Sequence, residues 1–307
     1  MKKSTLIKIS AFGVSLIGVS YMAVSKKLFD DCLKNNQPSK AQDSTDYSGI
    51  NQLIDEVTPW FENIEKKEVK IKSHDDLLLN GHLLHHPNSK KYVILIHGYK
   101  STIKTLYYHA YNFYQAGYNI LLIDQRSHGA SDGDYLTLGY LEAKDVSLWI
   151  DYLIALCPSC IIGMLGVSMG GATVANISGY TLPLNVKWII EDCGFSSIEN
   201  MLLDQANRKY NFDHPIMLKG FSLLCKLKNG FTLKKADYIK QVEKSKTPIL
   251  FIHGDQDEFV PVEMCYQLFE AAKCHKDIFI AEGQGHLGAC LDPHYFKTVF
   301  NFIYKYE

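Results

Sequence analysis

The stretch Gly166-Val167-Ser168-Met169-Gly170 stands between an apolar run, residues 161–165, and a helix-like run, residues 171–177. A short buried strand, a sharp G-x-S-x-G turn and a helix together present the serine hydroxyl at the top of a sheet. Glycines fit this turn because the strand folds back closely against the helix and the backbone needs unusual dihedrals. The pattern therefore predicts that Ser168 is a nucleophile, with an ordinary tight turn as the alternative interpretation.

An acidic and a histidine motif follow the serine in sequence, each after an apolar run. Residues 248–252 lead into His253-Gly254-Asp255-Gln256-Asp257, and residues 278–281 lead into a turn that ends at His286. The order serine, acid, histidine is typical of α/β-hydrolases and differs from the chymotrypsin and subtilisin orders. From about residue 60 to residue 305, the chain resembles a serine hydrolase of the α/β-hydrolase superfamily.

The motifs narrow the resemblance to part of that superfamily. Together with the serine turn and the two motifs above, His97-Gly98-Tyr99 and the loop at residues 124–131 are similar to bacterial cinnamoyl-esterase-like and S9/S33-peptidase-like hydrolases. The resemblance implies an α/β fold with a mostly parallel twisted sheet, helices on both faces and a helical lid insertion. It is specific for the fold and the catalytic machinery, and weak for the substrate.

The resemblance also implies roles for individual residues. Ser168 is the expected nucleophile, His286 the general base, and Asp257 the acid that orients the histidine. Asp255 competes for the last role, but the G-x-x-D spacing counted from Gly254 favours Asp257.

An oxyanion hole is expected beside the serine. Residues 91–96 are the continuous apolar run of a strand buried on both faces, and they lead into His97-Gly98-Tyr99. The resemblance implies that the backbone amides of Tyr99 and Met169 stabilise the developing oxyanion. It also implies that the loop at residues 124–133 is structural and braces this strand.

The composition favours one large domain. The chain has 307 residues, of which 47% are hydrophobic, and a net charge of −1, which gives no whole-protein field that favours nucleic acid. We expect a polar linker at residues 28–48, a hydrolase domain at residues 49–307, and a lid at about residues 195–246. The lid region holds ten Lys and Arg against five Asp and Glu. This excess is either a solvated helical face or a patch that meets anionic lipid or a negatively charged substrate.

Residues 1–27 are predicted to lie outside the hydrolase fold. Lysines flank an uncharged run at residues 9–25, and its seventeen residues would span about 25 Å as a helix, at the short end for a bilayer. An uncleaved membrane anchor is the favoured interpretation. A secretory signal cleaved near Ala23-Val24-Ser25, or a buried or interfacial helix, is the alternative. The protein is thus expected to be membrane-anchored, or secreted if the segment is cleaved.

No cofactor or metal is predicted. Cys157 and Cys160 form the one close pair among eight cysteines, and a C-x-x-C pair can be redox-active or half of a zinc site. No second pair or His-Cys cluster completes four zinc ligands, so we interpret the pair as a loop between a helix and a strand. There is also no Gly-rich phosphate loop.

Hydrolysis of a carboxylic ester with a small or medium acyl group is the predicted function. A peptidase of the aminopeptidase or acylpeptidase type is an alternative, although the basic lid offers no obvious carboxylate to hold a substrate amine. Thioesterase or lysophospholipase activity would use the same acyl-enzyme chemistry. A non-catalytic, membrane-tethered scaffold is the remote alternative, and the intact set of Ser168, Asp257 and His286 argues against it.

Overall fold

The computed structural model describes residues 20–34, 47–211 and 215–307. Its centre is one eight-stranded sheet with the strand order β1-β2-β4-β3-β5-β6-β7-β8. Only β2 runs against its neighbours, and the remaining pairs from β4 to β8 are parallel. The strands are β1 Lys67–Lys72, β2 Leu78–Leu84, β3 Lys91–Ile96, β4 Asn119–Ile123, β5 Ile161–Val167, β6 Val186–Asp192, β7 Ile249–Gly254 and β8 Lys276–Ala281.

Helices cover both faces of this sheet, which explains why its central strands are apolar on both sides. One hydrophobic core forms between the sheet and α4, α5 and α9, and the second forms between the sheet and α2, α3 and α10. The α/β-hydrolase architecture expected from the sequence is confirmed. The covering helices are α2 Ser48–Asn63, α3 Tyr107–Gln115, α4 Glu142–Leu156, α5 Met169–Ile177, α9 Val262–Ala271 and α10 Tyr295–Ile303.

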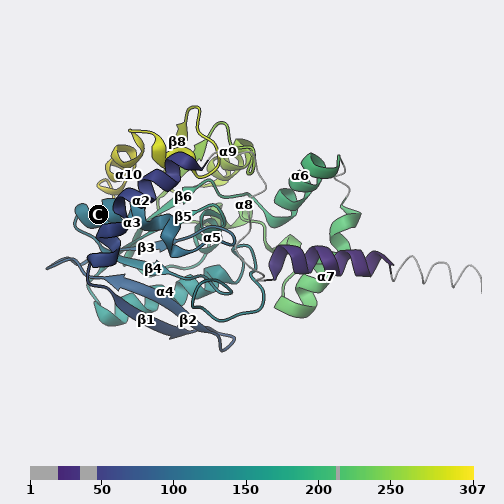
Figure 1. Cartoon of the computed structure of the whole chain (residues 1–307), viewed down its shortest axis with the longest axis horizontal. Helices are drawn as coiled ribbons and strands as arrows, with labels where there is room; N and C mark the ends of the chain where they lie inside the picture. The colour runs from purple at the N-terminus through teal and green to yellow at the C-terminus, as the bar shows by residue number, and fades with distance from the viewer. Residues whose placement is uncertain (1–19, 35–46, 212–214) are drawn as a thin grey trace, which may run out of the picture.

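A helical insertion separates β6 from β7, in the region where the lid is expected. It contains α6 Ile198–Tyr210, α7 Ile216–Asn229, a 3₁₀ turn at Leu233–Lys235 and α8 Ile239–Val242. Helices α6 and α7 project from the sheet domain at the end of the molecule where residue 20 also lies (Figure 1). Gly230, with a φ of 75°, ends α7 in the left-handed conformation that glycine adopts without strain.

Residues 20–33 form a helix that lies against α7 (Figure 1). Phe29 and Leu33, one helical turn apart, are each 1% exposed, and Lys34 forms a β-bridge with Tyr135. The linker predicted from the sequence begins at residue 28. Residues 28–34 are instead packed into the fold, because the side chains of Phe29 and Leu33 are buried.

Most of the predicted membrane segment, residues 1–19, lies outside the described residues, as do residues 35–46 of the expected linker. In the part of the chain that the structure describes, no helix is both long and apolar enough to cross a membrane.

Candidate active site

Ser168 occupies a strained turn between β5 and α5. Its φ of 58° and ψ of −117° are uncommon for a residue with a side chain. The turn is tight because a Cβ added at Gly166 would lie 2.0 Å from the carbonyl oxygen of Gly170. The Ser168 N–H donates to the carbonyl of Asp192 at 2.8 Å, which fixes the turn against the neighbouring strand.

The structure brings the serine, histidine and acid predicted from the sequence into one hydrogen-bonded chain. Nε2 of His286 lies 2.9 Å from Oγ of Ser168, and Nδ1 of His286 lies 2.7 Å from Oδ2 of Asp257. All three side chains are buried. They follow β5, β7 and β8, whose carboxyl ends meet at one edge of the parallel sheet. In this arrangement the imidazole can take the serine proton while the carboxylate holds the other ring nitrogen.

Asp257 accepts three hydrogen bonds, and a second histidine lies beside it. The backbone N–H groups of Phe259 and Val260 donate to Oδ1, both at 2.8 Å, and His286 donates to Oδ2 at 2.7 Å. Nε2 of His253 lies 3.1 Å from Oδ2 as well. Burial by itself would raise the pKa of Asp257, but the interactions with the two histidines outweigh it and hold this pKa well below its usual range. The side chain is therefore a carboxylate, and it fixes Nδ1 of His286 as the protonated nitrogen.

Asp255, the competing acid, serves a different purpose. Its Oδ1 accepts the N–H of Gly283 at 2.7 Å in the turn that follows β8. Asp257, and not Asp255, is thus the acid that contacts His286.

The loop after β3 lies beside the nucleophile. A Cβ added at Gly98 would lie 3.3 Å from Cβ and 3.7 Å from Oγ of Ser168. Tyr99 follows directly, and Met169 is the first residue of α5, where amides have no acceptor within the helix. The two amides predicted for the oxyanion hole therefore belong to segments that flank the serine.

His97 shapes this loop as a neutral side chain. Its Nδ1 donates to the carbonyl of Gly98 at 2.8 Å, and its Nε2 accepts the N–H of Gln125 at 3.2 Å. Complete burial lowers the pKa of His97 to about 3, so the ring is uncharged near neutral pH.

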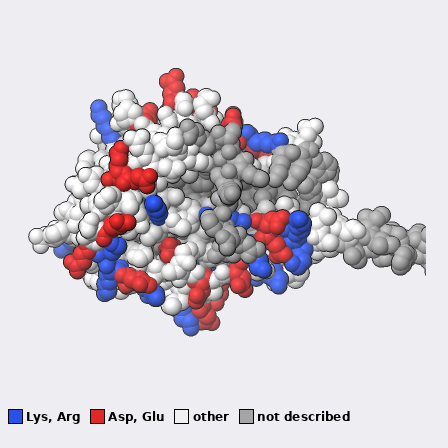
Figure 2. All heavy atoms as spheres, viewed as in Figure 1, with Lys and Arg blue, Asp and Glu red and all other residues white. Residues whose placement is uncertain are grey.

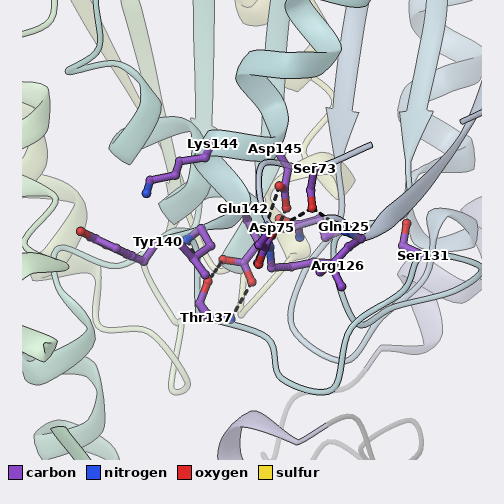
Figure 3. A network of polar contacts seen from close by, with 12 residues as sticks. Ser73, Asp75, Gln125, Arg126, Ser131, Thr137, Tyr140, Glu142, Lys144 and Asp145 are labelled. Carbon is purple, nitrogen blue, oxygen red and sulfur yellow. Dashed lines mark hydrogen bonds and ion pairs between the residues drawn. The ribbon is translucent and has the colours of Figure 1, made fainter. Parts of the chain in front are cut away.

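The loop after β4 carries Gln125 and Arg126, which belong to a network of polar contacts (Figure 3). Arg126 forms two hydrogen bonds with Asp145, at 2.6 and 2.7 Å, and reaches Asp75 at 2.9 Å. Gln125 donates to the carbonyl of His97 at 2.6 Å and accepts from Thr173 of α5. These contacts tie the β4 loop to both the loop after β3 and helix α5.

Comparison with known proteins agrees with this architecture. The family model described as "Serine aminopeptidase, S33" matches residues 87–190, and the one described as "Serine hydrolase (FSH1)" matches residues 146–287. An uncharacterised protein of Bacillus subtilis, YqkD, is 26% identical over 246 residues, which are 79% of this chain and 81% of that protein.

Two solved structures share the fold at low identity. An esterase of Pyrococcus furiosus superposes with a TM-score of 0.66 at 20% identity, over 88% of this chain and 97% of that chain. Est1E of Butyrivibrio proteoclasticus, solved with ferulic acid, gives a TM-score of 0.60 at 21% identity, over 78% of this chain and 98% of that chain. The chain has the α/β-hydrolase fold, and the two family models that match it both describe serine hydrolases.

One residue of this α/β-hydrolase that the sequence interpretation left without a role is His253. It is fully buried, and its Nε2 lies 2.9 Å from the carbonyl of Val260 and 3.1 Å from Oδ2 of Asp257. Burial would lower the pKa of His253, but the carboxylate of Asp257 raises it. The available signal was its place directly after the apolar run of β7, four residues before the acid.

The lid of the hydrolase contacts the loop that carries the acid. Gln205 of α6 donates to the carbonyl of Phe259 at 2.6 Å, and Arg208 donates to the carbonyl of Glu258 at 3.0 Å. The ring of Phe259 packs against His286 with centroids 4.9 Å apart. The lid is therefore linked through Phe259 to the histidine that contacts the nucleophile.

The N-terminal helix, residues 20–33, contacts the loop that follows β3. Tyr99 donates its hydroxyl to the carbonyl of Cys32 at 2.7 Å, and Lys100 reaches the carbonyl of Asp31 at 2.9 Å. These carbonyls belong to the last turn of the helix. No local sequence pattern could have indicated contacts between residues so far apart in the chain.

Among the described residues, the possible metal ligands and the cysteines form neither a metal site nor a disulfide. No group of three or more His, Cys, Asp or Glu side chains among the described residues could hold a metal ion. None of the eight cysteines, all of which lie among the described residues, forms a disulfide, and Cys157 and Cys160 lie at the turn between α4 and β5.

Proposed function

We propose that this chain hydrolyses carboxylic esters by acyl transfer through Ser168. The observation that carries the proposal is the continuous set of hydrogen bonds from Oγ of Ser168 through His286 to Asp257. The strained serine turn and the flanking oxyanion loop supply the remaining parts that this chemistry requires.

In the first half of the reaction, Nε2 of His286 takes the proton of Ser168 as Oγ attacks the carbonyl carbon. The amides of Tyr99 and Met169 stabilise the tetrahedral oxyanion. The imidazolium, stabilised by Asp257, then gives its proton to the departing alcohol, and the acyl group stays on Oγ.

In the second half, water replaces the alcohol. His286 takes a proton from the water as the oxygen attacks the acyl carbon, and a second tetrahedral oxyanion forms. Collapse of this intermediate returns the proton to Oγ of Ser168 and releases the carboxylic acid.

The substrate class is the second part of the proposal. A small-molecule ester is supported by the two solved structures that share the fold, one an esterase and the other bound to ferulic acid. The peptidase alternative is favoured by the description of the S33 family model. Lid helix α7 carries three lysines and no acid, so it offers no partner for a substrate amine. A thioester or a lysophospholipid would use the same site.

A membrane location is also proposed, with residues 9–25 as the anchor. The uncharged run between lysines supports it, and secretion after cleavage is the alternative. Cleavage near Ala23-Val24-Ser25 would remove Tyr21 and leave Ser25 at or near a free chain end. Both residues contact α7 in this structure, and this favours the uncleaved form.

Fluorophosphonate labelling of the full chain tests the hydrolase proposal. Ser168→Ala is expected to abolish labelling, whereas Ser178→Ala, which alters another buried serine at the end of α5, is expected to retain it. Turnover of p-nitrophenyl esters of rising chain length, compared with aminoacyl p-nitroanilides, tests ester against peptide preference. A chain that folds but neither labels nor turns over any of these compounds would refute the proposal.

A further inference from the structure

Lid helix α7 carries an exposed apolar stripe. Ile216, Leu223 and Leu227 are spaced seven and four residues apart, so they share one side of the helix. Leu227 is 70% exposed, and the other two are nearly half exposed. Phe221 and Cys225 face the opposite way and are fully buried. The helix is therefore apolar on its outer side as well as on the side that packs on the domain.

The N-terminal helix is bound tightly to this lid helix. The hydroxyl of Tyr21 donates to the carbonyl of Ile216 at 2.6 Å and accepts the N–H of Gly220 at 2.8 Å. A Cβ at Gly220 would lie 2.2 Å from Oγ of Ser25, so glycine is what allows the two helices to approach. Residues 20–33 and α7 consequently form one packed unit.

The outer side of this unit is basic as well as apolar. Lys219 and Lys226 adjoin the stripe at helical spacing, and Lys228 follows, while α7 has no acidic residue. On the N-terminal helix, Val24 is 68% exposed, and the charges of Lys26 and Lys27 are balanced by Asp30, which pairs with Lys26, and Asp31, so the excess of positive charge belongs to α7. The face of the body seen in Figure 2 instead shows acidic and basic side chains intermingled. On lid helix α7, exposed aliphatic and basic side chains therefore coincide.

We propose that this face of the lid lies on an anionic lipid bilayer. We call it the lid face and define it by five exposed residues of α7: Ile216, Lys219, Leu223, Lys226 and Leu227. Aliphatic side chains enter the boundary of the acyl chains while adjacent lysines meet anionic head groups, as in interfacial helices.

The proposal extends the membrane segment proposed above, because that segment leads directly into the helix bound to α7. The uncharged run at residues 9–25 includes Tyr21 and Ser25, which both contact α7. A bilayer that receives this run must therefore come close to the lid face. Gln205 of the lid contacts Phe259, and Phe259 packs against His286. Contact of the lid with a bilayer could therefore affect the position of His286.

Tryptophan quenching tests the contact in the full chain. Leu227→Trp places the probe on the lid face, and Leu184→Trp, at a residue 89% exposed before the amino end of β6, is the matched control. Both are reconstituted in vesicles of equal parts brominated phosphatidylcholine and phosphatidylglycerol, with the emission of the three native tryptophans subtracted. We expect quenching of the Leu227→Trp emission by at least about twofold relative to the control.

Recovery of the chain with vesicles measures whether the membrane segment inserts. This measurement is independent of the contact made by the lid face. A recovered chain whose Leu227→Trp emission is unquenched, or quenched no more than the control, overturns the proposal. A chain that does not associate with vesicles overturns it as well. Association of two chains through α7, seen as emission that depends on protein concentration and not on bromine, would assign the face to a second copy instead.

The need for the positive charges of α7 is tested separately. Replacing Lys219, Lys226 and Lys228 by Gln is expected to weaken the contact by roughly fivefold for each lysine near the surface. Quenching should then fall in the vesicles that contain phosphatidylglycerol. Equal quenching on neutral and anionic vesicles, before and after the substitutions, would overturn the preference for anionic lipid.

Discussion

Nε2 of His253 lies 3.1 Å from Oδ2 of Asp257, the same oxygen that accepts the N–H of His286 at 2.7 Å. The acid of the candidate site is therefore held by two histidines, of which only one contacts the serine. The carboxylate of Asp257 is buried, so removing one of its donors leaves its negative charge with fewer partners. The side chain of Asp257 is then also less restrained.

Replacing His253 separates its positioning role from a merely structural one. His253→Leu is expected to lower kcat for a p-nitrophenyl ester about tenfold with little change in KM, because the lost donor loosens Asp257 and thus His286. His253→Gln keeps an N–H near the position of Nε2 and should recover most of the rate. Fluorophosphonate labelling rates provide the second readout. Equal rates for the two variants, at equal stability, would show that the contact with Asp257 is immaterial.

Deleting N-terminal residues tests whether the described helix belongs to the enzyme. A chain that begins at residue 20 should unfold in urea and label with fluorophosphonate like the full chain. A chain that begins at residue 35 should lose about 3–6 kcal/mol of unfolding free energy, because Phe29 and Leu33 are buried in the native protein. Its labelling should also slow, since Tyr99 and Lys100 lose the carbonyls they contact. Two chains of equal stability and labelling rate would contradict this expectation.

The fold and the serine, acid and histidine could be predicted because their signals are local. Apolar runs mark the strands, and the serine turn, the G-x-x-D spacing and the terminal histidine each lie within a few residues of a strand end. The structure accordingly brings Ser168, Asp257 and His286 together. Their catalytic roles, and that of the two oxyanion amides, remain predictions for the labelling experiment.

The contacts of the N-terminal segment could not be predicted because they join distant parts of the chain. Tyr21 and Gly220 are 199 positions apart, and nothing near either residue indicates the other. An uncharged run after lysines favours a membrane segment whether or not its end packs on a lid. The role of His253 was hidden for a similar reason, since only the folded loop brings its ring against Asp257.

Removing the buried guanidinium of Arg126 should destabilise the protein strongly. Arg126→Ala leaves the buried carboxylate of Asp145 without its partner, and breaking such a pair costs about 3–5 kcal/mol. Arg208→Ala, which breaks a partly exposed pair with Asp204, should cost about 1 kcal/mol or less. Urea unfolding of the two variants checks the contrast, and similar losses would show that burial does not set the cost.

The loss of unfolding free energy at acidic pH should depend in part on His109. Complete burial lowers the pKa of His109 from 6.5 to about 4, and its Nε2 contacts the hydroxyl of Tyr295 at 3.2 Å. Between these two pKa values the unfolded chain binds a proton that the folded chain does not, so the contribution to stability falls as the pH falls. Near pH 5 this amounts to about 2 kcal/mol, and near pH 7.5 it is close to zero.

His109→Gln isolates this contribution, because it removes the titrating ring and keeps an N–H donor for Tyr295. The pKa of Asp192, which burial raises to about 6, acts in the opposite direction and is expected to be shared by the native chain and the variant. The variant should therefore lose about 2 kcal/mol less than the native chain when urea unfolding is compared between about pH 7.5 and pH 5. Parallel pH dependences in the two proteins would mean that the histidine is protonated in the folded state or titrates alike in both states.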